Sequence, residues 1–130
     1  MRIVTLEELL SLVDEYSQHD VHRLFDQSQE LVVYEVDGKF RAAINMCVEE
    51  NDVRFGNTLL HYCSEDEVLG DFITFAMERY IGKRLHISVC SEEPLCYEVL
   101  RYYDFTVDEV SCATVDDEDK VEYITCSKQL

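Results

Sequence analysis

The segment at 85–90 constrains the fold of this chain more than any other, because it is predicted to be a short, mainly apolar strand between two helices. The segment before it, 64–81, opens with the capping-box pattern Ser-x-x-Glu, continues with apolar residues at helical spacing and stops at Gly82. The segment after it, 91–103, has a proline in its first turn, as many helices do. A strand between two crossover helices is typical of a parallel position covered on both faces. The pattern predicts an α/β fold with a mixed sheet.

The remaining patterns place an antiparallel meander before this unit and a hairpin after it. Asp37-Gly38 is the strongest hairpin signal in the chain, and Gly56-Asn57 predicts a bulge in the third meander strand. The sequence contains no linker or repeat, so residues 1–130 are predicted to form one domain. In chain order, the further elements are a strand at 2–4, helices at 5–17 and 19–29, strands at 31–36, 39–48 and 53–63, and strands at 105–114 and 121–127.

Charge is the strongest compositional feature, because 28 acidic and 11 basic residues give a net charge of −17. Such a surface repels nucleic acids, anionic lipids and phosphorylated cofactors, and it attracts basic proteins. The first residues lack the apolar run of a signal peptide, and no stretch approaches the ~20 apolar residues of a membrane span. We therefore expect a cytoplasmic protein that contacts neither nucleic acid nor membrane directly. Solubility alone is the alternative meaning of the charge.

Neither disulfides nor a metal site are expected. None of the six cysteines forms a Cys-x-x-Cys pair, and most lie in apolar runs, so the sequence predicts free thiols. His19 and His22 are three residues apart on a polar stretch, without a partner at ligand spacing. A solvated helix face is the simpler interpretation of that pair.

The order of elements resembles that of the GNAT (GCN5-related N-acetyltransferase) superfamily over essentially the whole chain. The closest part is 86–105, which is similar to the family's strand followed by a helix of the form Asn-x-x-Ala-x-x-x-Tyr-Glu-x-x-Gly-Phe. As a short, divergent version of this pattern, the chain is similar to acetyltransferase-like proteins of bacteriophages. The resemblance implies a GNAT-like fold in which strand 85–90 runs parallel to the last meander strand and splays from it, leaving the family's cofactor notch.

The resemblance also implies a Gly-rich turn whose backbone N–H groups hold the pyrophosphate of acetyl-coenzyme A. In this chain the turn is 63–70, and Gly70 is the residue that matches the pattern. The cluster Glu65-Asp66-Glu67 occupies the place of the anion, and each carboxylate–phosphate pair at ~8 Å costs about 2 kcal/mol. We expect Ser64 and Glu67 to cap the helix and no cofactor to bind. The alternative is acetyl-coenzyme A in a non-standard loop, for which the candidates are Tyr62, Cys63, Leu69 and Gly70.

Catalytic residues of the family are only partly matched. Alignment on Phe105 places Leu100 where the family has the tyrosine that protonates the leaving thiolate, and leucine cannot transfer a proton. Tyr97 and Tyr103, about one helical turn to either side, are the candidates that could substitute. The candidates for a general base on the meander are Glu49, Glu50 and His61, with Glu49 and His61 kept as the site candidates.

The sequence favours a GNAT-like protein with an eroded acetyl-coenzyme A site that acts through contact with a basic protein, in an inhibitory, DNA-mimicking or minor structural role. Its origin would be a phage or another mobile element. The expected interaction residues are Asp116, Asp117, Glu118 and Asp119 at a hairpin tip, and Glu65 and Asp66 at a helix N-terminus, where the helix dipole should stabilise them. An active acetyl-coenzyme A-dependent N-acyltransferase is the alternative.

Overall fold

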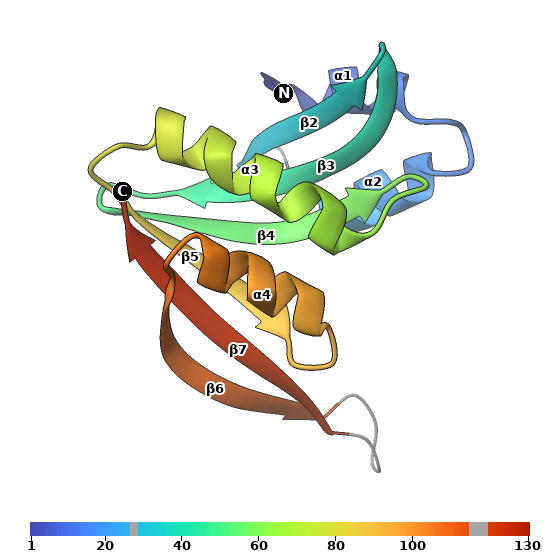
Figure 1. Cartoon of the computed structure of the whole chain (residues 1–130). Coiled ribbons are helices and arrows are strands. Elements are labelled where there is room, and N and C mark those ends of the chain that lie inside the picture. The colour runs from blue at the N-terminus through green and yellow to red at the C-terminus, as the bar shows by residue number, and fades with distance from the viewer. Residues whose placement is uncertain (27–28, 115–119) are drawn as a thin grey trace.

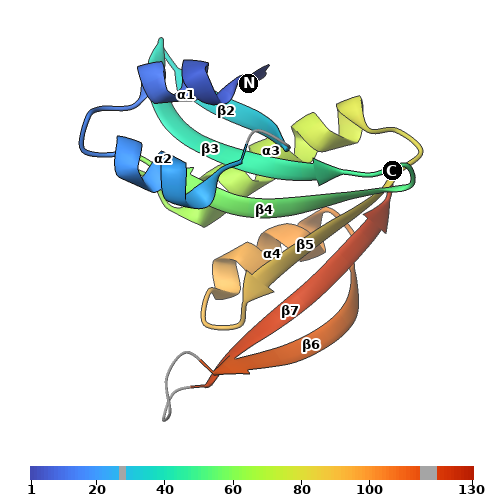
Figure 2. The same cartoon turned by 180° about the vertical axis from the view of Figure 1, so that it is seen from behind.

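A seven-stranded mixed sheet forms the middle layer of the molecule, with two helices on each face (Figures 1 and 2). The computed structural model describes residues 1–26, 29–114 and 120–130. The strand order is β1-β2-β3-β4-β5-β7-β6. The elements are β1 (Arg2–Val4), α1 (Leu6–Leu12), α2 (Gln18–Leu24), β2 (Glu30–Val36), β3 (Lys39–Val48), β4 (Asp52–Leu60), α3 (Glu65–Arg79), β5 (Arg84–Cys90), α4 (Pro94–Tyr102), β6 (Thr106–Thr114) and β7 (Lys120–Gln129). The predicted α/β class and the GNAT-like order of elements are confirmed.

Each face of the sheet carries its own hydrophobic core. The larger core lies under α3 and α4 and centres on Phe72, Ile73, Leu85 and Leu100, all of them at most 1% exposed. The smaller core lies under α1 and α2 and includes Leu9, Val21 and Val33. Alternation along β2 and β3 supplies both cores, because neighbouring side chains on a strand point to opposite faces. The sheet therefore separates two surfaces with different helices and loops.

The two N-terminal helices are shorter than the predicted 5–17 and 19–29. α1 ends at Leu12 and α2 at Leu24, and the next residues, Val13 and Phe25, have extended backbones. Both side chains are buried, with 8% and 5% exposed. The extended residue after each helix places an apolar side chain in the smaller core. The free energy gained by burying that side chain exceeds the gain from another helical turn.

Other element ends also differ from the sequence-based boundaries. β4 stops at Leu60 instead of residue 63, and Tyr62 beyond it has a φ of +53°. α3 stops at Arg79, and the predicted terminator Gly82 has a φ of +93° in the following turn. β7 continues to Gln129, because its end pairs with Arg84 at the start of β5. The Asp37-Gly38 hairpin is as predicted, with φ values of +53° and +76°.

β4 and β5 pair in parallel over only their first residues. The paired positions are Asp52 with Arg84, Val53 with Leu85 and Arg54 with His86. β5 then pairs with β7 along its whole length, from Arg84 to Cys90. Figure 2 shows β5 leaving β4 and continuing beside β7. The predicted parallel, splayed pair is thus confirmed.

A bulge bends β4 just after the point where the two strands part. Two residues of β4, Gly56 and Asn57, lie opposite the single residue Asn45 of β3. Asn45 is only 4% exposed, and its side-chain oxygen accepts the backbone N–H of Asn57 while its amide donates to Gln29. The predicted bulge is confirmed, and a buried asparagine holds it in place.

Of the helices in the described ranges, none has the length and apolarity needed to cross a bilayer. All six cysteines carry free thiols in the structure, and Cys96 and Cys126 are fully buried.

We predict that Gly56→Ala destabilises the protein by about 1–3 kcal/mol, because overpacking at a rigid site costs that much. A Cβ at this position would lie 2.3 Å from the side-chain oxygen of Asn45. Gly70→Ala is the matched control, since its Cβ would meet nothing closer than 3.4 Å and alanine favours the helix by up to about 1 kcal/mol. Urea unfolding of both variants measures the difference. Equal midpoints would show that the bulge tolerates a side chain.

Candidate functional site

The notch between the splayed strands opens into a cavity of about 440 Å³ at the N-termini of α3 and α4. Both helices begin there because each follows one of two parallel neighbouring strands, and the ends of such strands lie at the same edge of a sheet. The cavity is lined by residues of β4, both helix starts and the connections before them: Leu60, Ser64, Glu65, Asp66, Glu92, Glu93, Pro94, Leu95 and Cys96.

The N-terminus of α3 is not capped in the way the Ser-x-x-Glu pattern predicted. Ser64 is the N-cap residue, but its side chain makes no cap hydrogen bond. The N–H of Glu67 donates to the backbone oxygen of Ser64 at 3.1 Å. That contact closes the first turn through the main chain and makes a side-chain cap unnecessary for Glu67. The predicted capping box is therefore wrong, and the first N–H groups of α3 lack a serine cap.

Acidic groups from both helix starts meet in the notch. Ligand-type atoms of Glu65, Glu93 and Cys96 all lie within 4.8 Å of one another. The pKa of Glu65 is raised to about 7, mainly by burial, with smaller contributions from its hydrogen bond to Glu93 and from the charges of Glu93 and Asp66. Two carboxyl groups this close share a proton in preference to carrying two charges. The expectation that the helix dipole stabilises an ionised Glu65 is thus wrong, because burial and like charge dominate.

Cys96 completes this cluster as a neutral thiol. Its Sγ donates to the carboxylate of Glu93 at 3.4 Å. Burial raises the pKa of Cys96 to about 12, with the charge of Glu65 as the next cause. A thiol with so high a pKa is a poor nucleophile and a poor metal ligand, because both roles need the thiolate. The three groups are best described as a hydrogen-bonded cluster that joins the two helix starts.

A second cavity, of about 450 Å³, continues between α3 and α4. Four acidic residues line it, and no lysine or arginine is among the described residues that do so. Its lining consists of Asp66, Glu67, Gly70, Asp71, Leu95, Glu98, Val99, Tyr102 and Tyr103. We call this second cavity the outer groove. It shares Asp66 and Leu95 with the cavity in the notch, so the acidic lining is continuous between the two.

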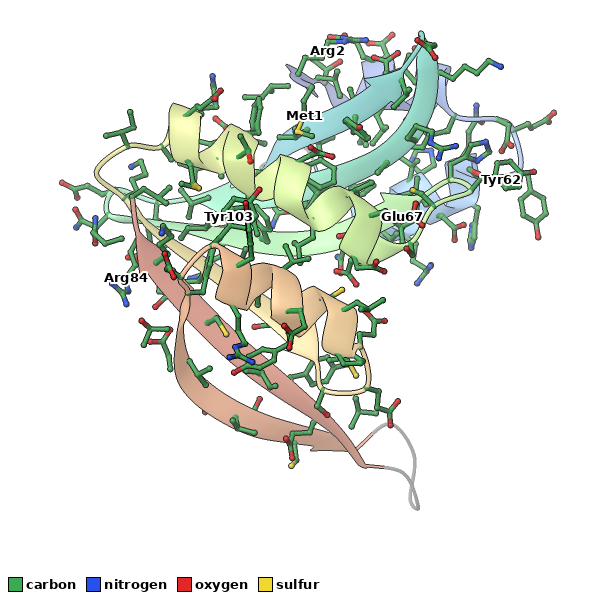
Figure 3. All side chains as sticks on the ribbon, in the orientation of Figure 1. Met1, Arg2, Tyr62, Glu67, Arg84 and Tyr103 are labelled. Atoms are coloured by element: carbon green, nitrogen blue, oxygen red, sulfur yellow. The ribbon has the colours of Figure 1, made fainter. Side chains whose placement is uncertain are left out.

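The candidate cofactor residues do not come together. Gly70 lines the outer groove, whereas Leu69 is buried in the larger core. Cys63 donates its thiol to the backbone oxygen of Arg41, and Tyr62 is 86% exposed. Figure 3 shows Tyr62 and Glu67 near the same end of α3, with Tyr103 further along that helix.

The candidate catalytic residues are likewise dispersed. The Tyr103 hydroxyl lies 3.3 Å from Thr74 Oγ1 on α3, and Tyr97 is a half-buried residue against the larger core. Glu49 lies at the opposite end of β4, where it pairs with Arg54 at 3.8 Å. His61 lines a cavity that contains no residue of α3 or α4. Leu100, which alignment on Phe105 places where the family has its acid, is fully buried.

Glu93 and Cys96, which complete the cluster around Glu65, and Glu92, which lines the same cavity, were not among the sequence-based site candidates. A usable signal was present, because the predicted parallel strands each lead directly into a helix. Two such helix starts must lie side by side, so acidic residues at one should have been considered together with those at the other. The interaction candidates Asp116, Asp117, Glu118 and Asp119 lie outside the described residues.

No protein-family model matches the sequence, and no curated protein matches it. Solved structures do match the fold. An IAA acetyltransferase from Bacillus cereus superposes with a TM-score of 0.70 at 11% identity, covering 99% of this chain and 97% of that one. The ribosomal-protein-S18-alanine N-acetyltransferase from Escherichia coli gives a TM-score of 0.68 at 11% identity, with coverage of 97% and 91%. A GNAT family acetyltransferase from Elizabethkingia anophelis, solved with acetyl-CoA bound, gives 0.60 at 13%, with coverage of 94% and 88%. This chain therefore has the fold of GNAT acetyltransferases.

We predict that Glu65→Gln stabilises the protein at about pH 8 and that the gain shrinks toward pH 5. The folded-state pKa of Glu65, about 7, lies above its ordinary 4.5. As the pH rises between these values the unfolded chain loses the proton first, so wild-type stability falls across that window and stays reduced above it. Glutamine is neutral at every pH and removes this loss.

Urea unfolding at both pH values measures the effect. Glu67→Gln is the matched control, because Glu67 is an exposed acid in the same helical turn. A gain for Glu65→Gln that is the same at both pH values would contradict a shared proton in the notch.

Proposed function

We propose that this chain uses the GNAT fold as a scaffold for binding a basic protein and does not carry acetyl-coenzyme A as a cofactor. The observation that carries this proposal is the carboxyl cluster of Glu65, Asp66 and Glu93 at the mouth of the notch. In a fold of this kind a helix N-terminus next to a cleft is suited to an anion. Here the anionic groups belong to the protein itself.

The residues present do not fit a pyrophosphate group. At ~8 Å and an effective dielectric constant near 20, each carboxylate–phosphate pair costs about 2 kcal/mol before screening. Several such pairs offset most of the roughly 8 kcal/mol that corresponds to micromolar affinity. The outer groove supplies no positive charge to offset this repulsion, since its described lining includes four acidic residues and no basic one. Leu100 cannot supply the proton that a departing thiolate needs.

The same acidity favours a basic protein partner. With 28 acidic and 11 basic residues, the surface potential accelerates association with positively charged surfaces. Inhibition of a host protein, mimicry of nucleic acid and a minor structural role are all consistent with such a surface. A phage or mobile-element origin and a cytoplasmic location belong to this proposal, and so does binding through the acidic stretch 116–119.

A second candidate is an active N-acetyltransferase with an altered cofactor loop. The specific observation in its favour is that Ser64 leaves the first N–H groups of α3 without a side-chain cap, beside a notch that is still open. The similar structure from Elizabethkingia anophelis was solved with acetyl-CoA bound. Glu65 protonated at a pH below about 7 would also lessen the repulsion.

We predict that isothermal titration with acetyl-coenzyme A at about pH 8 shows no binding up to the millimolar range, because the notch is then at its most negative. The double variant Glu65→Gln/Glu93→Gln tests the cause, since gained binding would identify these carboxyl groups as the barrier. Micromolar binding by the wild-type protein would overturn the proposal and favour the second candidate.

We further predict that the complex with a partner isolated from the native host weakens steeply with salt and loses association rate when Asp116, Asp117, Glu118 and Asp119 are changed to Asn or Gln. The control removes the same charge from scattered exposed acids, namely Glu7, Glu15, Glu50 and Glu78. Surface plasmon resonance gives both rates. Affinity that is independent of salt, or an equal loss in the control, would exclude recognition through the 116–119 stretch.

A further inference from the structure

A third cavity lies on the other face of the sheet from the notch. It measures about 870 Å³ and is bordered by the α1–α2 connection, the β2–β3 hairpin and the residues that follow β4. Phe40 and Leu59, beside it, pack against the core under α1 and α2. The residues that matter for its chemistry are Asp14, Lys39, Phe40, Arg41, His61 and Tyr62. Its volume falls within the range of small-molecule sites.

Backbone irregularities from two strands meet at this cavity. The register between β2 and β3 shifts where Tyr34 pairs with Ala42 but Glu35 pairs with Phe40, so Arg41 is an extra residue in β3. A bulge of this kind redirects a side chain from its regular position. The backbone oxygen of Arg41 accepts the N–H of His61 at 2.8 Å, which fixes the end of β4 beside the bulge.

Tyr62 adds backbone strain and exposed aromatic surface. Its φ of +53° is in the left-handed region, which is strained for a bulky residue and tends to occur at functional sites. The Tyr62 side chain is 86% exposed, and its ring meets that of His61 edge to face at 4.4 Å between centroids. The His61 ring lies 6.3 Å from that of Phe40. Three rings therefore line one side of the cavity.

The charge of this cavity is unusual for so acidic a protein. Lys39 and Arg41 both line it, and neither makes an ion pair or a side-chain hydrogen bond to a described residue. Five other arginines do pair with acids: Arg2, Arg23, Arg54, Arg79 and Arg101.

The acids that line the cavity are Asp14 and Asp37. The Asp14 carboxylate accepts the backbone N–H of Ser17 at 2.8 Å, and that hydrogen bond is the main cause of its lowered pKa. Asp37 lies exposed at the tip of the hairpin. The two basic side chains are thus left available for an anion from outside the protein.

We propose that this cavity binds a small molecule that carries a carboxylate or phosphate group on a planar ring. Arg41 holds the anion, because its guanidinium group can donate two parallel hydrogen bonds to either group, and Lys39 adds a second positive charge. His61 and Tyr62 contact the ring of the ligand. The site lies on the opposite face from the notch. A test of this proposal therefore does not depend on whether acetyl-coenzyme A binds or whether the acidic surface binds a partner.

The test uses three small probes with the full-length, ¹⁵N-labelled protein: phenyl phosphate, benzoate and the uncharged benzyl alcohol. We expect one of the two anions to cause saturable shifts of the amide signals of Arg41, His61 and Tyr62, and benzyl alcohol to cause none. The anion that binds more tightly distinguishes a phosphate ligand from a carboxylate ligand. Absence of saturable shifts with both anions, or equal shifts with benzyl alcohol, would overturn the proposal.

Variants then identify the anion-binding group. Arg41→Gln should weaken binding by about tenfold or more, as expected for the loss of a charge-assisted hydrogen bond. Lys39→Gln, at an exposed hairpin position, should weaken it by a smaller factor. Arg54→Gln is the matched control, because Arg54 is an exposed arginine that pairs with Glu49 away from the cavity. Melting temperatures establish that each variant is folded. Unchanged affinity in both Arg41→Gln and Lys39→Gln would overturn the proposal.

Discussion

The notch and the acidic groove beside it depend on the short parallel contact between β4 and β5. The two strands pair at three positions and then part, since β4 bends at the Gly56-Asn57 bulge and β5 pairs along its whole length with β7. The separation leaves a notch, and the helices that follow the two strands both start at its mouth. The buried Asn45 is central to this arrangement, because its side-chain oxygen accepts the N–H of Asn57 in the bulge and leaves little space for a Cβ at position 56.

Two helix N-termini beside a notch create a region of positive potential that the protein occupies with its own acids. The dipoles favour negative charge near both starts. Yet Glu65 is buried next to Glu93, and its raised pKa shows that desolvation and like charge outweigh the dipole. The cluster with Cys96 joins α3 to α4 at the place where an anionic ligand would have to enter. In the proposed function, these carboxyl groups keep an anionic ligand out of the notch.

The cavities on the two faces of the sheet differ in charge. The charged residues that line the groove between α3 and α4 are all acidic among those described, whereas the cavity near α1 and the β2–β3 hairpin contains Lys39 and Arg41 beside Asp14 and Asp37. A net charge of −17 says nothing about this difference. It arises because alternate residues of one strand, and the loops at its two ends, face different environments.

The sequence by itself determined the elements whose signals are local. The Asp37-Gly38 turn, the glycine bulge and the β5 strand between two helices each rest on a few adjacent residues, and each is present as predicted. Helix ends were misjudged where burial of Val13 and Phe25 decided them, because burial depends on distant partners. Tertiary structure likewise decided that Glu65 meets Glu93, 28 residues away. It also decided that Arg41 lines a cavity without an ion-pair partner among the described residues. Proton sharing and ion pairing require two groups at short distance, and only the folded chain sets that distance.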